Sequence, residues 1–146
     1  MKEAGFNAVR TSHNPPAEAF LDACDHLGLL VIDESFDGWR SAKTPKDYSI
    51  LFDRWWTKDI ESMVLRDRNH PSVVMWSLGN EAGSGENFRN CYDAARKLDP
   101  RPIHYEGTRS NGSYGGGRFS DFYSKMYPGM AWMNQNTSNL DKPMFI

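Results

Sequence analysis

The sequence predicts an α/β fold, a partial (β/α)8 barrel, and three observations lead to that class. Short apolar runs alternate along the chain with longer segments of helical periodicity, which is typical of a parallel sheet covered by helices. Nearly every apolar run ends in polar side chains, as in barrel enzymes, which gather their sites at the carboxyl ends of strands. A closed barrel needs eight units and roughly 250 residues, so the 146 residues predict one incomplete barrel domain over 1–146.

The first elements are a strand, a helix and a second strand. Residues 6–10 predict the first strand, and Asn14 with the two prolines after it predicts a helix start. Gly28 ends that helix, and residues 29–32 are a continuous apolar run, as in a strand buried on both faces. The helix carries its apolar stripe on Ala17, Phe20, Leu21, Cys24 and Leu27.

A loop over 35–49 separates these elements from the rest of the chain. A long helix over 52–68 follows, and a third strand over 73–76 leads into residues 77–81. The inner side of the long helix is predicted to carry Trp55, Trp56, Ile60, Met63 and Val64. Beyond it we expect a helix over 88–98, a strand over 102–106, a glycine-rich loop over 110–117, a strand over 122–127, a helix over 131–136 and a strand starting at 142.

A doubly wound sheet is the rival architecture. It would concentrate polar groups at one switch point and carry a glycine-rich first turn, yet no G-x-G-x-x-G follows a strand. The glycines at 115–117 lack a following Lys-Ser/Thr, so a phosphate loop is not expected. Polar residues instead end many strands, which favours the barrel: Arg10, His13, Asp33, Glu34, Asn80, Glu81, Glu106, Lys125 and Tyr127.

The overall charge narrows the possible partners. A net charge of −2, from 17 basic and 19 acidic residues, gives no electrostatic reason to expect nucleic acid or membrane as a partner. No apolar run is long enough to span a bilayer, and no targeting segment is visible. Residues 1–5 are typical of the last turn of a helix, so we expect the chain to begin inside a longer protein. Cys24 and Cys91 are expected in the core, without a disulfide, which leaves the compartment open.

Glu81 is the best single catalytic candidate. It follows an apolar strand, next to Asn80 and under Trp76, where a partly desolvated carboxyl would keep its proton. Such a group suits a general acid that protonates a leaving alkoxide oxygen, and Asn80 could donate a hydrogen bond to a neighbouring substrate hydroxyl. The alternative is that Asn-Glu simply caps the next helix, and the dipeptide alone favours that alternative.

The longer string around Glu81 changes this balance. Residues 66–81 (RDRNHPSVVMWSLGNE) resemble the acid/base signature of family 2 glycoside hydrolases, and the SLGNE form looks most like the β-galactosidases. The resemblance covers almost the whole chain and implies strands two to seven of a TIM barrel, without the first and last units. Further matches follow in family order at 7–15 (NAVRTSHNP), 30–34 (LVIDE), 105–107 (YEG), 125–127 (KMY) and 142–146 (KPMFI).

The resemblance implies a retaining exo-glycosidase, most closely a β-galactosidase acting on terminal β-galactosyl residues. Glu81 matches the acid/base, Asn80 the contact to the sugar 2-hydroxyl and His13 a histidine that bonds the substrate. Arg10 matches the arginine that supports the nucleophile, and Tyr127 a tyrosine close to it. The alternatives are another family 2 activity, β-glucuronidase or β-mannosidase, or a non-catalytic carbohydrate-binding barrel. Retention of a strand-end acid argues against the last.

A glycosidase that retains the anomeric configuration needs a second carboxyl group, about 5–5.5 Å from the first. The resemblance places this nucleophile just beyond Ile146, so residues 1–146 alone are expected to be inactive. Without the resemblance, Glu34 or Glu106 would be the candidates for the second carboxyl. The alternative for both is a structural carboxylate bonded to arginine or to backbone amides.

No metal or cofactor is expected. Relatives that bind Mg²⁺ use a Glu and a His after the third strand, and residues 35–40 (SFDGWR) offer neither at that spacing. The histidines show no zinc-type spacing, and His70 and His104 are expected to orient neighbouring backbone. The expected partner is a β-galactoside or related oligosaccharide, and the oligomeric state stays open.

Overall fold

The computed structural model describes residues 1–82, 85–106, 119–138 and 140–146. Four parallel strands form the main sheet in sequential order, β1 (Ala8–Arg10), β2 (Leu30–Glu34), β3 (Val73–Asn80) and β4 (Ile103–Glu106). A doubly wound sheet reverses its strand order at the switch point, whereas a barrel adds each new strand on the same side. The observed order therefore matches the barrel.

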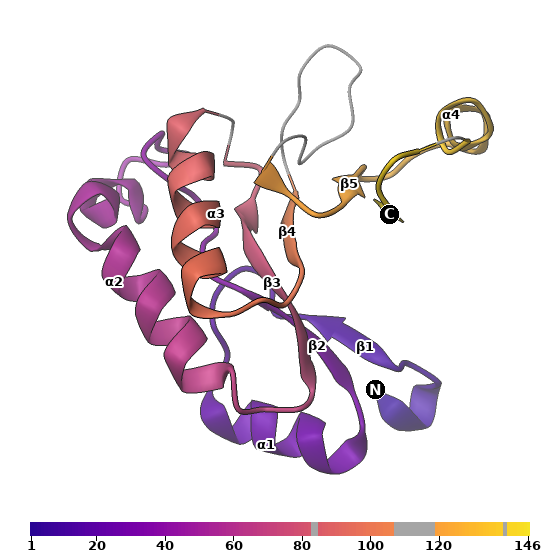
Figure 1. The fold of residues 1–146 in the computed structure, drawn as a ribbon, viewed down its shortest axis with the longest axis horizontal. Coiled ribbons are helices and arrows are strands. Elements are labelled where there is room, and N and C mark those ends of the chain that lie inside the picture. The colour runs from indigo at the N-terminus through magenta and orange to yellow at the C-terminus, as the bar shows by residue number, and fades with distance from the viewer. Residues whose placement is uncertain (83–84, 107–118, 139) are drawn as a thin grey trace.

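Helices connect the strands of this sheet. They are α1 (Glu18–Leu27), α2 (Ser49–Asp67) and α3 (Glu86–Leu98), and α2 and α3 lie side by side against the sheet (Figure 1). A short 3₁₀ helix, Lys2–Ala4, precedes β1 and ends at Gly5 with φ 86°. Within the part of the chain that the structure describes, no helix has the length and apolarity to cross a bilayer.

The C-terminal part of the chain again pairs its strands in parallel. β5 (Tyr123–Ser124) pairs in parallel with β6 (Met144–Phe145), and α4 (Met130–Asn136) lies between them in the chain. The backbone N–H of Asp121 donates to the carbonyl of Ile103 at 2.8 Å, which joins this part to β4. The glycine-rich loop predicted over 110–117 lies outside the described residues.

Several element boundaries differ from the sequence prediction, and two of these differences matter for the site. α1 begins at Glu18 with Ala17 as its N-cap, because Asn14 is used in a turn, where its N–H donates to the carbonyl of Thr11. β3 continues to Asn80, four residues further than predicted, because it stays paired with β4 up to Glu106. The longer strand carries Asn80 to the edge of the sheet.

The apolar core lies between the sheet and the helices, and loop 35–48 is part of it. Trp39 is buried, stacks on Tyr105 with ring centroids 4.7 Å apart, and donates its indole N–H to the carbonyl of Leu78. Both cysteines are free and buried, as predicted. Trp55 was predicted to face inward, but it lies outside the core with the Lys58 ammonium 4.7 Å from its ring centre.

Gly79 brings this loop into contact with the end of β3. Its φ is +148°, and a Cβ there would meet the carbonyl oxygen of Phe36 at 3.0 Å and Trp39 Nε1 at 3.2 Å. A side chain at this position would push the loop away from the strand. The close approach therefore helps to fix the residues that follow, Asn80 and Glu81.

Two buried carboxyls, one on β2 and one on α2, lie on the helix side of the sheet. Asp33 and Asp67 are both fully buried, and Arg66 donates to the two oxygens of Asp67 at 2.6 and 2.7 Å. Burial, together with the neighbouring Asp67, raises the pKa of Asp33 to about 8. Asp33 is therefore neutral at pH 7, and one arginine balances one carboxylate.

This assignment predicts how stability depends on pH. Between the ordinary pKa of 3.8 and about 8, the folded chain holds a proton that the unfolded chain releases, so stability falls as pH rises through this window. Asp33→Asn should remove that dependence, a slope of up to about 1.4 kcal/mol per pH unit. The measurement is the urea midpoint of the full-length protein between pH 5 and 8.

Asp93→Asn is the matched control, because Asp93 lies exposed on α3. It should keep the slope of the unsubstituted protein. If Asp33→Asn also keeps that slope, the neutral assignment is wrong.

Candidate active site

The ends of β1 and β2 are joined by a buried ion pair. Arg10 donates from Nε to Glu34 Oε2 at 2.5 Å and from Nη2 to Glu34 Oε1 at 3.0 Å. His13 Nδ1 lies 2.7 Å from Oε1, and the Ser77 hydroxyl donates to Oε2 at 2.6 Å. Glu34 has no exposed surface, and each of its two carboxylate oxygens has two hydrogen-bond partners among Arg10, His13 and Ser77.

The same arginine orients Asn80 at the end of β3. Arg10 Nη2 donates to Asn80 Oδ1 at 3.2 Å, which leaves the amide –NH₂ group to donate elsewhere. The main-chain carbonyl of Asn80 accepts from Lys43 Nζ at 2.6 Å, and Lys43 also bonds Asp37. Asn80 is therefore held from two sides, its side chain by Arg10 at the end of β1 and its main chain by Lys43 of loop 35–48.

Glu81 follows directly on this held residue. Its φ of 45° lies in the left-handed region, which non-glycine residues adopt at an energetic cost and often at functional sites. The N–H of the next residue, Ala82, donates to the Tyr105 hydroxyl at 3.1 Å. Glu81 itself is exposed, so the partial desolvation expected from the sequence is not provided by the residues that the structure describes.

Trp76 lies apart from the polar cluster that Arg10, His13, Glu34, Ser77 and Asn80 form. It is fully buried, its indole N–H donates to Asp99 Oδ1 at 3.1 Å, and the Arg101 guanidinium lies 5.6 Å from its ring centre. Successive side chains of a strand point to opposite faces. Because Ser77 faces Glu34, Trp76 faces the helices and lies away from the polar residues at the strand ends.

The remaining predicted residues, Glu106 and Tyr127, come at or after the carboxyl ends of the later strands β4 and β5. Glu106 ends β4 and pairs with Asn80 in the strand register. Tyr127 follows β5, is 94% exposed and has a φ of 49°. The structure thus brings Arg10, His13, Glu34 and Asn80 together, whereas Tyr127 stands in solvent.

Three residues of the cluster were missed from the sequence. Ser77 and Lys43 were not singled out, although a serine inside an apolar strand is itself a signal. His104 was expected to orient backbone, but it bonds two serine side chains, with Nδ1 3.1 Å from Ser77 Oγ and Nε2 3.1 Å from Ser124 Oγ. Burial, with the nearby charge of Arg10, lowers the pKa of His104 to about 3, so its ring is neutral.

Potential metal ligands cluster elsewhere. Among the residues that the structure describes, Asp22, Asp25 and His70 bring their ligand atoms within 4.8 Å of one another, near the start of β3. His70 Nδ1 already bonds Asp25 at 2.6 Å, and Asp25 accepts from the N–H of Ser72 at 2.8 Å. The His70 ring is therefore linked to the backbone N–H of Ser72 through the Asp25 carboxylate.

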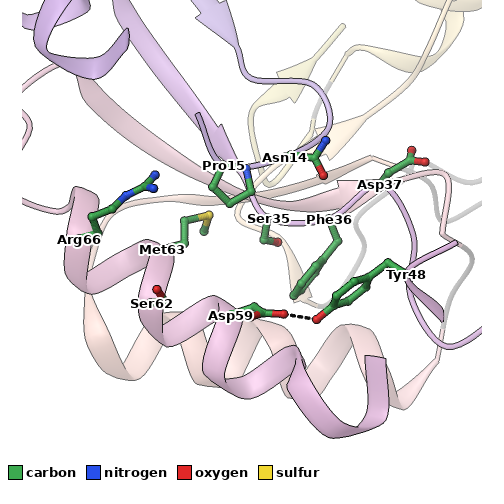
Figure 2. A pocket seen from close by; sticks show the side chains of 10 residues that line it. All are labelled: Asn14, Pro15, Ser35, Phe36, Asp37, Tyr48, Asp59, Ser62, Met63 and Arg66. Atoms are coloured by element: carbon green, nitrogen blue, oxygen red, sulfur yellow. Dashed lines mark hydrogen bonds between the residues drawn. The ribbon is translucent and has the colours of Figure 1, made fainter. Parts of the chain in front are cut away.

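A cavity of about 330 Å³ lies beside the cluster, between α2 and the segments that follow β1 and β2 (Figure 2). Its wall includes the stacked rings of Phe36 and Tyr48, and the Tyr48 hydroxyl donates to Asp59. Asn14 and Ser35 line it and are the sequence neighbours of His13 and Glu34. None of the clustered polar residues lines it, so it is separate from them.

The strand order and the polar groups at the carboxyl ends of β1, β2 and β3 define the class, an α/β barrel with an enzyme-type site at its carboxyl end. The chain belongs to glycosyl hydrolase family 2, since residues 1–145 match the model described as "Glycosyl hydrolases family 2, TIM barrel domain". Both the family resemblance and the partial-barrel prediction are thereby confirmed.

Relatives of known name agree with the family. The β-galactosidase BoGH2A of Bacteroides ovatus is 56% identical over 81 residues, 56% of this chain and 10% of that protein. A putative β-glucuronidase of Formosa agariphila is 53% identical over 108 residues, 73% of this chain and 10% of that protein. A solved β-glycosidase from Bacteroides vulgatus superposes with a TM-score of 0.77 at 37% identity, covering 92% of this chain and 18% of that one. The chain thus spans about a tenth of the length of these curated relatives.

The Glu34 contacts predict a large effect of a small change. Glu34→Gln removes the charge that accepts from Arg10 and His13, and should lower the free energy of unfolding by about 1.5–3 kcal/mol. Urea denaturation of the full-length protein measures this loss.

Asp53→Asn is the matched control, because it makes the same change at an arginine-paired carboxylate whose side chain is 67% exposed. An exposed pair contributes little, so no measurable loss is expected there. Equal losses in the two variants would show that Glu34 does not anchor the site.

Proposed function

We propose that this chain carries the acid/base half of the active site of a retaining glycoside hydrolase, with Glu81 as the acid/base. The observation that carries the proposal is the bond from Arg10 to Asn80 Oδ1. It frees the amide –NH₂ of Asn80 for a sugar hydroxyl at the residue directly before Glu81. Family membership supports the reaction type.

The reaction proceeds in two displacements. A nucleophilic carboxylate, expected on the segment that follows β6, attacks the anomeric carbon while Glu81 gives its proton to the glycosidic oxygen, and the aglycone leaves. Glu81, now a carboxylate, takes a proton from water as the water oxygen attacks the glycosyl ester and releases the nucleophile. Asn80 donates to the sugar 2-hydroxyl, a bond that strengthens in the transition state.

Glu34 has a supporting role in this proposal. Its two oxygens already accept from Arg10, His13 and Ser77, so it offers no free lone pair aimed at a substrate carbon. His13 uses Nδ1 toward Glu34, which leaves Nε2 as the ring atom that can reach a sugar hydroxyl. Tyr127 and Glu106 stay in the proposal as residues at the mouth of the site.

A β-galactoside is the substrate that we favour. The relative from Bacteroides ovatus is named a β-galactosidase and shares 56% identity over its matched residues. A glucuronide would need a cation for its carboxylate. Among the described residues, Arg10 is committed to Glu34 and Asn80, Lys43 to Asp37 and Asn80, and Lys125 Nζ lies 5.5 Å over the ring of Trp132. A β-glucuronide is the second candidate, since the Formosa agariphila relative is named a putative β-glucuronidase.

The acid/base role predicts a dependence on the leaving group. In the full-length protein, Glu81→Ala should lower kcat/KM for phenyl β-galactoside by about 10²- to 10⁴-fold, the contribution of general acid catalysis. With 2,4-dinitrophenyl β-galactoside the loss should be much smaller, because that phenolate leaves without a proton. Steady-state kinetics on the two substrates measure the difference.

Glu61→Ala, at an exposed glutamate on α2, should change neither rate. Equal losses on both substrates, or no loss on either, would contradict the role given to Glu81. Running β-glucuronides in parallel decides the sugar, because a higher kcat/KM on them would replace the galactoside and leave the acid/base untouched.

A further inference from the structure

A buried polar chain runs beneath the Arg10–Glu34 pair. Ser77 Oγ lies 2.6 Å from Glu34 Oε2 and 3.1 Å from His104 Nδ1, and His104 Nε2 lies 3.1 Å from Ser124 Oγ. The four side chains are 0 to 2% exposed. They come from β2, β3, β4 and β5, so the chain crosses four successive strands.

The contacts determine where each proton lies. Glu34, ion-paired with Arg10, can only accept, so the single hydroxyl proton of Ser77 points to Glu34. Ser77 must then accept from His104, which places a proton on Nδ1. Burial holds the pKa of His104 at about 3, so the ring carries one proton only and Nε2 accepts from Ser124.

We propose that His104 is a positioning residue of the glycosidase site, and that its neutral Nδ1–H tautomer directs the hydrogen bonds from Ser124 through Ser77 to Glu34. This inference rests on the proposed function. These hydrogen bonds fix the Glu34 carboxylate in the orientation in which it binds Arg10. Arg10 in turn sets the amide of Asn80, the residue proposed to meet the sugar 2-hydroxyl.

His104 also contacts the last strand, β6. The ring of Phe145 in β6 packs on the imidazole with centroids 4.8 Å apart. The His104 side chain thus contacts both Ser77, which bonds Glu34, and β6, the strand after which the nucleophile is expected. Since errors of about 1 Å between reacting groups can cost about 10²-fold in rate, a fixed imidazole here affects both halves.

The test compares variants of the full-length protein on an aryl β-galactoside. His104→Leu removes the donor and the acceptor and should lower kcat by about 10- to 100-fold, the equivalent of one hydrogen bond to a charged group. KM should change little, because the bond from Asn80 matters most in the transition state. His104→Gln, whose amide can donate to Ser77 and accept from Ser124, should restore most of kcat.

Ser120 provides the matched control. It is a serine with 2% exposure, four residues before Ser124 in the sequence. Its hydroxyl donates to the carbonyl of Ile103 and takes no part in the hydrogen bonds of His104. Ser77→Ala should lower kcat as His104→Leu does, whereas Ser120→Ala should not. If Ser77→Ala and Ser120→Ala have the same kcat, or if His104→Gln does no better than His104→Leu, the positioning role is overturned.

A structural measurement covers the case in which His104→Leu does not fold. Neutron diffraction from crystals of the deuterium-exchanged full-length protein should show deuterium on His104 Nδ1 and none on Nε2. Deuterium on Nε2 would overturn the proposal. If Glu81→Ala is inactive on phenyl galactoside but folded His104→Leu keeps its kcat, this inference fails alone. If Glu81→Ala keeps full activity, the proposed function fails with it.

Discussion

Much of the structure depends on the buried carboxylate of Glu34. A charge without solvent exposure is tolerated only when it is paired and hydrogen-bonded. The partners of Glu34 come from three other places: Arg10 at the end of β1, His13 in the loop after it, and Ser77 in β3. Satisfying one carboxylate therefore aligns the carboxyl ends of three strands.

The alternation of β2 and β3 separates the site from the core. Glu34 and Ser77 point to the inner side, whereas their neighbours Asp33 and Trp76 point to the helices. The helix side then supports the site indirectly. Trp39 packs on Tyr105 and bonds the carbonyl of Leu78, so the core holds the last residues of β3.

Hydrophobic periodicity in the sequence predicted the strands and helices, and the polar residues at the strand ends favoured the barrel over a doubly wound sheet. Local patterns determine these features, and the motif over 66–81 identified the family, which the family model confirmed. The face of Trp76 could not be predicted in this way, because a short apolar run has no polar alternation to set its phase. The contacts of Trp76 to Asp99 and Arg101 show the phase only once the fold is known.

The polar network was harder to predict. His104 is 27 residues from Ser77 and 20 from Ser124 in sequence, so no local pattern links them. Lys43 reaches Asn80 from a loop without periodicity. The exposure of Glu81 was also missed, since burial at the end of a strand depends on which segments cover it.

The most direct measurement is a crystal structure of the full-length Glu81→Gln protein with an intact aryl β-galactoside bound. The account predicts the sugar at the carboxyl end of β3, with its 2-hydroxyl bonded to the Asn80 –NH₂ group and the side chain at position 81 against the glycosidic oxygen. Arg10 would still bond Asn80 Oδ1 and Glu34. A ligand bound away from β3, or an Asn80 amide turned with its oxygen to the sugar, would contradict the account.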